Sequence, residues 1–155
     1  CFRTGKSTMI EFQKGSASSK IEKFLNQVHE EYEQSNGISD KYFEFSITIS
    51  SDNQIVGVLS GYTVFSEVYV ENIVIHRNYR EKGYGKKLLK FLEDKFENEG
   101  YNNINLSTSE FQAPTFYEKC GYKLEFVRKN KINPKLTKYF FVKFFDNPNQ
   151  YMGVL

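Results

Sequence analysis

The feature that most restricts the fold is a Val/Ile-rich run that leads through a glycine-containing turn into an amphipathic segment. Residues 67–76 read EVYVENIVIH, residues 80–87 read REKGYGKK, and Leu88, Leu92 and Phe96 then recur every four residues. A run rich in β-branched residues favours a strand, whereas apolar residues three or four apart favour a helix. A strand, a tight turn and a helix in this order predict an α/β protein whose helices pack on a sheet.

The rest of the chain extends this pattern. Strands are predicted at residues 10–13, 42–50, 54–65, 67–76, 103–109, 122–128 and 138–145, and helices at 16–34, 84–99 and 113–119. The first helix is indicated by Ile21, Phe24, Leu25 and Val28 on one face. The element order β-α-β-β-β-α-β-α-β-β predicts a mixed sheet of about seven strands that is partly antiparallel.

Length, charge and cysteine content limit the class of protein. The chain has 155 residues, enough for one domain, and its formal net charge is only +2, which argues against a protein that coats nucleic acid. Two cysteines cannot make a four-thiolate metal site or a disulfide framework, so we expect no metal and a cytoplasmic location. No apolar run reaches the roughly 20 residues of a membrane-spanning helix.

The first eight residues, CFRTGKST, differ in character from the rest of the chain. We expect residues 1–8 to be an expression scar or an upstream leader, and residues 9–155 to form a single domain. Gly5-Lys6-Ser7-Thr8 matches the end of a phosphate-binding loop, but the chain lacks the earlier glycine and the preceding strand that this motif needs. We therefore assign the segment no phosphate-binding role.

The glycine turn before the second helix is the strongest local signal. Gly83 and Gly85 permit a sharp turn and a close approach of a ligand to the backbone. The first N–H groups of a helix have no helical acceptor and, with the helix dipole, favour an anion such as phosphate. A glycine turn with a solvated basic cap explains the same residues, so this segment alone does not decide between the two.

A second segment makes the combination specific. Residues 113–122 read APTFYEKCGY, which alone indicates only a short helix ended by a glycine. Together, Arg-x-x-Gly-x-Gly after a Val/Ile strand and this segment about thirty residues later resemble the GCN5-related N-acetyltransferase (GNAT) superfamily. Gln112–Tyr117 is similar to a bacterial subset, and Val70–Ile75 is similar to glucosamine-6-phosphate acetyltransferases.

The resemblance implies a fold and a cosubstrate. It implies a mostly antiparallel sheet splayed at its centre, helices on both faces, and acetyl-CoA bound in the gap without a metal. Backbone amides from about Lys82 to Lys87 would hold the pyrophosphate, and the preceding strand would pair with the pantetheine arm, with an N–H of Val74 or Ile75 polarising the thioester carbonyl. The implied binding residues are Ile73, Val74, Ile75, Arg80, Glu81, Lys82, Gly83, Tyr84, Gly85 and Lys86.

The resemblance also implies direct acetyl transfer to a primary amine of a small molecule or peptide. Tyr117 matches the family's general-acid tyrosine, which protonates the departing CoA thiolate, although packing alone also explains it. Glu71 is the first choice of general base. The alternative is that its charge lies at a strand edge and discourages aggregation. If the strand alternates regularly, Tyr69 and Glu71 share one face and Val70 and Asn72 the other. His76 is assigned a structural or phosphate-facing role.

Other features remain open. Glu110 stands where many members have an asparagine that contacts the cofactor arm. Acidic residues around the first helix would suit a cationic acceptor, but a solvated helix face is the preferred explanation. Cys120 is interpreted as a packed residue, and a homodimer through the last strand is predicted. The alternative to an enzyme is a non-catalytic acyl-CoA-binding sensor. A nucleic-acid or membrane partner is not expected.

Overall fold

The computed structural model describes residues 7–151, which divide into two units between Asn36 and Gly37. In the first, α1 (Ser19–Ser35) begins where Ser18 Oγ accepts a hydrogen bond from the Ile21 N–H, and none of its residues is buried. The strand predicted at residues 10–13 is wrong, because this segment pairs with no strand among the described residues, and Ile10 is 98% exposed. Residues 1–6 of the predicted leader lie outside the described residues.

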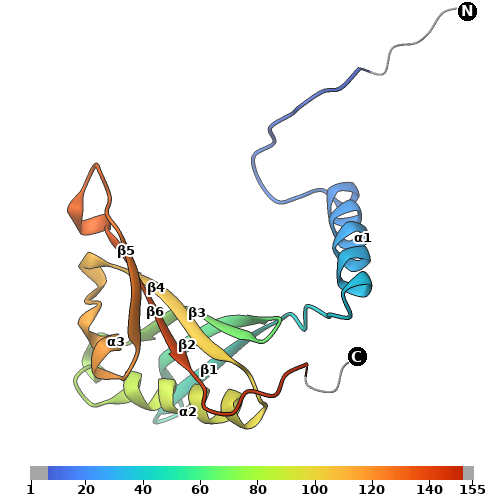
Figure 1. Ribbon diagram of the computed structural model, residues 1–155. Helices are drawn as coiled ribbons and strands as arrows, with labels where there is room; N and C mark the ends of the chain where they lie inside the picture. Colours follow the sequence, from blue (N-terminus) through green and yellow to red (C-terminus); the bar gives the residue numbers. More distant parts are fainter. Residues whose placement is uncertain (1–6, 152–155) are drawn as a thin grey trace, which may run out of the picture. The chain divides into compact units, whose positions relative to one another are not determined.

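The second unit is built on one sheet with strand order β1-β2-β3-β4-β6-β5 (Figure 1). Its strands are β1 (Phe43–Ser51), β2 (Gln54–Val64), β3 (Glu67–Ile75), β4 (Asn103–Ser109), β5 (Lys123–Arg128) and β6 (Lys138–Phe144). The described residues thus form six strands rather than about seven. Only the β3–β4 pair is parallel, so the predicted mixed, mostly antiparallel sheet is confirmed.

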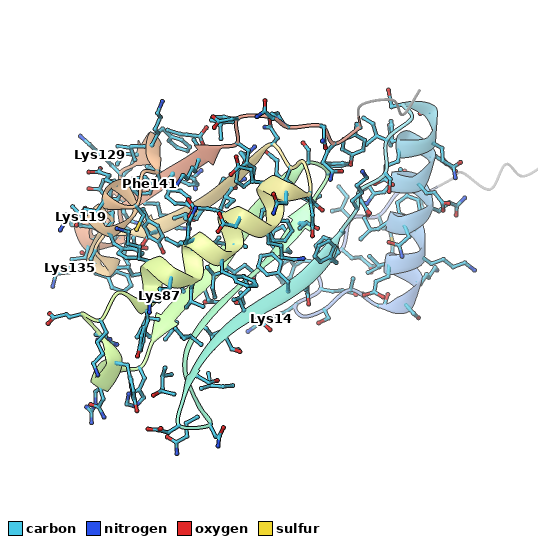
Figure 2. The ribbon with its side chains drawn as sticks, turned by 90° about the horizontal axis from the view of Figure 1, so that it is seen from below. Lys14, Lys87, Lys119, Lys129, Lys135 and Phe141 are labelled. Atoms are coloured by element: carbon cyan, nitrogen blue, oxygen red, sulfur yellow. The ribbon has the colours of Figure 1, made fainter. Side chains whose placement is uncertain are left out.

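The core lies between this sheet and two helices, α2 (Tyr84–Asn98) and α3 (Thr115–Lys119). The predicted stripe of α2 is buried, and Phe96 is fully enclosed, with its ring centroid 5.3 Å from that of Phe45 on β1. Phe141 of β6, labelled in Figure 2, is also fully buried. Three 3-10 turns complete the unit: Arg77–Tyr79, Glu110–Gln112 and Pro134–Leu136.

The sheet splits between β3 and β4, as the resemblance implied. The two strands pair only from Glu67↔Asn103 to Tyr69↔Asn105. Beyond that point β4 stays paired with β6 as far as Ser109, while β3 stays paired with β2 as far as Ile75. The diverging halves leave two strand edges that face each other without pairing.

A bulge on β3 coincides with the split. Val70 pairs with Gly61 and Asn72 pairs with Ser60, so Glu71 is an extra residue on β3. A bulge bends its strand and increases its local twist, which turns the end of β3 away from β4. Because Gly61 and Ser60 are adjacent, their partners lie on opposite faces. The predicted sharing of one face by Val70 and Asn72 is therefore wrong, since regular alternation does not hold across a bulge.

Candidate functional site

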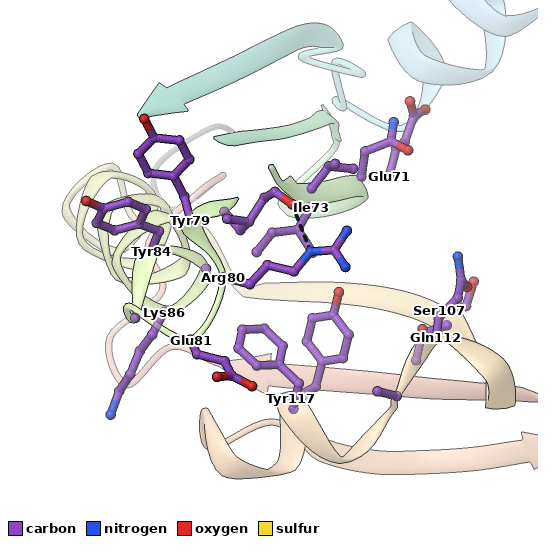
Figure 3. Close-up of a pocket in the computed structure, with 18 residues that line it drawn as sticks. Glu71, Ile73, Tyr79, Arg80, Glu81, Tyr84, Lys86, Ser107, Gln112 and Tyr117 are labelled. Atoms are coloured by element: carbon purple, nitrogen blue, oxygen red, sulfur yellow. Dashed lines mark hydrogen bonds between the residues drawn. The ribbon is translucent and has the colours of Figure 1, made fainter. Parts of the chain in front are cut away.

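The split in the sheet is the floor of a cleft of about 670 Å³ (Figure 3). This volume lies within the range of small-molecule and cofactor sites. The cleft is lined by the end of β3, the loop into α2, the end of β4 and the start of α3. Its lining residues are Glu71, Asn72, Ile73, Val74, Ile75, Tyr79, Arg80, Glu81, Gly83, Tyr84, Gly85, Lys86, Ser107, Thr108, Gln112, Ala113, Phe116 and Tyr117.

The two glycines of the turn serve different needs. Gly83 has φ +77° and ψ 13°, a left-handed conformation that L side chains rarely adopt, and a Cβ added there would meet nothing within 4 Å. Gly85 lies in the first turn of α2, and an added Cβ would stand 3.1 Å from Cζ of Phe116. The first glycine is therefore required by conformation, whereas the second leaves room between α2 and α3.

The N-terminus of α2 opens into the cleft. Lys87 N–H donates to the Gly83 carbonyl at 3.0 Å and is the first amide satisfied within the helix. The amides of Tyr84, Gly85 and Lys86 precede it and have no helical carbonyl to bond. In the described part of the chain, no side chain caps this end. The predicted amide set therefore ends at Lys86, because the Lys87 N–H is already used inside the helix.

Arg80 crosses the cleft from the glycine loop. Its Nε donates to the Ile75 carbonyl at 3.2 Å, and its guanidinium points between Ile73 and Tyr117 (Figure 3). Lys82 does not line the cleft, and its Nζ lies 5.1 Å from the centroid of the Tyr79 ring. Arg80 and the helix terminus therefore place positive charge at this end of the cleft.

His76 is structural in this arrangement. Its Nδ1 accepts a hydrogen bond from the Asn78 N–H at 3.1 Å, and its ring lies edge-on to Tyr79 with centroids 5.9 Å apart. His76 thus closes the turn that precedes the glycine loop. Of the two roles assigned from the sequence, these contacts favour the structural one.

The open edge of β3 presents the backbone of alternate residues. In an antiparallel pair, hydrogen-bonded and non-hydrogen-bonded positions alternate. The His76 N–H donates to the Val56 carbonyl, so Val74↔Val58 is the next hydrogen-bonded position and Val74 directs its backbone groups toward β2. Ile73 and Ile75 direct theirs toward the cleft, as the bond from Arg80 to the Ile75 carbonyl requires. The expectation that Val74 offers its N–H to the cleft is therefore wrong.

Tyr117 lies at the wall of the cleft opposite β3. It is 8% exposed and packs against Phe116, Tyr122 and Phe141, with ring centroids 5.2, 6.1 and 5.8 Å away. Its hydroxyl projects into the cleft toward Arg80 (Figure 3) and forms no hydrogen bond with another described residue. Burial, with a smaller contribution from Cys120, raises the pKa of Tyr117 to about 12. The phenol is therefore protonated at neutral pH.

Glu71 lies at the other end of the same cleft. It is exposed, and as the bulge residue it lies at the point where β3 leaves β4. In Figure 3 its carboxylate lies away from Tyr117. The structure therefore brings the predicted acid and base into one cleft, on opposite sides of the split.

Two further residues singled out from the sequence, Cys120 and Glu110, lie outside the lining of the cleft. Burial, followed by the charge of Glu93, raises the pKa of the Cys120 thiol, which argues against a nucleophilic thiolate. Glu110 begins the turn after β4, where its N–H donates to the Thr137 carbonyl. The structure therefore gives neither residue a place in the site.

Several lining residues were not predicted. Tyr79 stacks on Tyr84 with centroids 6.4 Å apart, and Ser107 enters from β4. Gln112 closes a capping box with Ser109, whose N–H donates to Gln112 Oε1 at 3.0 Å. No motif in the sequence marks Tyr79 or Ser107: Tyr79 lies in the turn just before Arg80, and Ser107 reaches the cleft because β4 diverges from β3.

No group of three or more His, Cys, Asp or Glu side chains within residues 7–151 is arranged to hold a metal ion. Within the same range, no helix has the length and apolar character needed to cross a bilayer.

Known proteins match the chain at the level of family and fold. A family model described as "Acetyltransferase (GNAT) family" matches residues 13–122. An acetyltransferase from Bacillus cereus is 24% identical, with a TM-score of 0.70 over 86% of this chain and 98% of that one. The ribosomal-protein-S18-alanine N-acetyltransferase from Escherichia coli is 16% identical, with a TM-score of 0.60 over 85% and 92%.

A third similar structure holds coenzyme A. It is an aminoglycoside 6'-N-acetyltransferase complexed with coenzyme A, 16% identical, with a TM-score of 0.56 over 84% of this chain and 81% of that one. At these identities the structural matches support the fold alone. No match is found among curated protein sequences.

Proposed function

Because this chain belongs to the acetyltransferase (GNAT) family, we propose that it transfers the acetyl group of acetyl-CoA to a primary amine of a small molecule or peptide. The observation that carries the proposal is the single cleft in which the free amides of α2, the open edge of β3 and the Tyr117 hydroxyl meet. A similar structure with coenzyme A bound supports the choice of cosubstrate.

The residues of the cleft fit acetyl-CoA. The amides of Tyr84, Gly85 and Lys86 suit the pyrophosphate, because they are unpaired donors at the positive end of a helix. Ile73 and Ile75 offer backbone groups at a strand edge, which suits an extended arm that carries amides. When bound, acetyl-CoA supplies the thioester carbonyl that an amine attacks.

Tyr117 acts as the general acid in this proposal. The nitrogen–carbon bond forms as the carbon–sulfur bond breaks, and the Tyr117 hydroxyl gives its proton to the departing sulfur. A general acid must carry its proton before the step, and the Tyr117 phenol does so at any physiological pH, although burial, which raises its pKa to about 12, also makes it a weaker donor than a free phenol. The amine loses one proton and Tyr117 regains the one that it gave to the sulfur, so the step balances.

Glu71 takes the proton of the amine in this proposal, through a water where the amine does not reach the carboxylate. Its exposure keeps it in contact with solvent, into which the proton is finally released. Ile73 and Ile75, whose backbone groups face the cleft, supply the N–H that polarises the carbonyl. The single domain of residues 9–155, a cytoplasmic location and a homodimer remain predictions.

A thermal melt with acetyl-CoA, followed by a turnover assay, tests the proposal. At 100 times Kd, acetyl-CoA should stabilise the protein by about 2.7 kcal/mol. In Gly83→Glu the carboxylate occupies the anion site, and the shift should disappear.

Tyr117→Phe should keep the shift but lose at least about tenfold in CoA release with an amine. Binding without release by the wild type would favour the acyl-CoA sensor, and absence of the shift would refute acetyl-CoA binding.

A further inference from the structure

A row of three tyrosine rings crosses the face of the sheet opposite α2. The ring centroids of Tyr42 and Tyr62 are 5.7 Å apart, and those of Tyr62 and Tyr69 are 5.1 Å apart. Tyr62 pairs with Glu44 on β1 and with Tyr69 on β3, so these three side chains share one face. Tyr42, two residues before Glu44, contacts the Tyr62 ring on that face. Phe45, the next residue along β1, packs against α2 and marks the other face. We call Tyr42, Tyr62 and Tyr69 the tyrosine row.

The tyrosine row runs to the edge of the cleft. Tyr69 Oη and Ser107 Oγ lie 3.4 Å apart in a hydrogen bond, and Ser107 lines the cleft from β4. Glu71 lines the cleft from β3, two residues after Tyr69. Adjacent strands are about 4.8 Å apart, so the row extends roughly 5 to 10 Å from β3 to the edge of β1.

Negative charge accompanies the row. Tyr42 Oη donates to Glu44 Oε1 at 3.0 Å, and neither Glu44 nor Glu71 forms an ion pair with another described residue. The pKa of Tyr42 is raised mainly by the hydrogen bond to Glu44 and that of Tyr62 mainly by burial, and the charge of Glu71 adds to both. Aromatic faces and uncompensated carboxylates are the surroundings that stabilise a cation.

We propose that the tyrosine row, with Glu44, binds a second cationic group of the acceptor, so that the substrate is a small diamine or polyamine, while Glu71 remains the base for the reacting nitrogen. This inference rests on the proposed function. The reacting nitrogen must lose its proton before it attacks, and these surroundings oppose that loss. The cation that binds to the tyrosine row is therefore another nitrogen of the same acceptor molecule, while the reacting nitrogen enters the cleft at Ser107.

Acetylation of matched acceptors tests the inference. The probes are 1,6-diaminohexane and 6-amino-1-hexanol, which differ only in the second amine. With acetyl-CoA at pH 7.5, we expect kcat/KM to be about tenfold higher for the diamine, through a lower KM, the size of effect of a desolvated cation–π contact. Equal kcat/KM values for the two acceptors would overturn the inference.

Variants locate the effect on the row. Tyr62→Leu should remove most of the tenfold preference, Tyr62→Phe should keep it within about threefold, and Glu44→Gln should reduce it. Phe126→Leu removes an exposed aromatic ring from β5, outside the row, and it should leave the preference unchanged. A loss of kcat/KM in Tyr62→Leu that is equal for both acceptors would show a structural role and overturn the inference.

Calorimetry separates this inference from the proposed function, because binding needs no turnover. With protein saturated by coenzyme A, 1,6-diaminohexane should bind about tenfold more tightly than 6-amino-1-hexanol, and Tyr62→Leu should abolish the difference. Tighter binding of the diamine without acetylation would refute the proposed function and support cation binding by the tyrosine row. Acetylation of both probes without any difference in their binding would support the proposed function and overturn the inference that the tyrosine row binds a cation.

Discussion

Replacing Gly83 with alanine should destabilise the second unit through the backbone alone. Gly83 has φ +77°, and a Cβ there would meet nothing within 4 Å, so no steric clash contributes. A non-glycine residue in the left-handed region costs about 1–2 kcal/mol. Alanine also lowers the entropy of the unfolded chain, which returns part of that cost. We expect a net loss of about 1 kcal/mol in the free energy of unfolding, or roughly 2–4 °C in Tm.

Gly85→Ala is the matched control. Its added Cβ meets Phe116 Cζ at 3.1 Å, the far end of a ring, while alanine improves the helix by about 0.5–1 kcal/mol. We expect the free energy of unfolding of Gly85→Ala to lie within about 0.5 kcal/mol of wild type. Urea denaturation followed by circular dichroism measures both variants. Gly83→Asn should lose less than Gly83→Ala, because asparagine tolerates this conformation better.

Equal stability of Gly83→Ala and the wild type would refute the reasoning. So would a larger loss in Gly85→Ala than in Gly83→Ala, because space rather than φ would then be limiting at this turn.

Two other predictions concern buried ionisable groups. The pKa of Tyr117 is about 12 in the folded chain against about 10 when unfolded, so its protonated form contributes about 2.7 kcal/mol of stability, complete below pH 10 and lost as the pH rises through 12. Tyr117→Phe should remove this share of the loss in urea titrations across that range, and a pH dependence equal to that of the wild type would contradict the burial of the phenol. Lys143→Met should destabilise the chain by about 3 kcal/mol, because it leaves the buried Glu93 carboxylate without its cation. Adding Glu93→Leu should restore most of that stability in the same assay, and additive losses would refute the coupling.

Periodicity predicted most of the fold because its signals are local. The apolar stripe of α2 and the strands around it follow from residues a few positions apart, and burial confirms them. The strand predicted at residues 10–13 has the right residue types, but a strand forms only against a partner, and local sequence does not specify one.

The site divides in the same way. Gly83, Gly85 and the helix after them are adjacent in sequence, so the uncapped start of α2, which suits an anion, was predictable from one segment. Tyr117 was found only through resemblance to a family. The bulge at Glu71 depends on the pairing of β3 with β2, and so do the faces on which Val70 and Asn72 lie. The sequence pattern of β3 alone does not indicate this bulge.

The sequence by itself determined the helices, the six strands of the sheet and the glycine turn, because these depend on the preferences of neighbouring residues. Only the tertiary structure decided that β3 and β4 separate after three residue pairs, that Ile73 and Ile75 rather than Val74 face the cleft, and that three tyrosines from β2, β3 and the approach to β1 form a row beside it. The physical reason is that register and bulges are set by pairing between segments far apart in the chain.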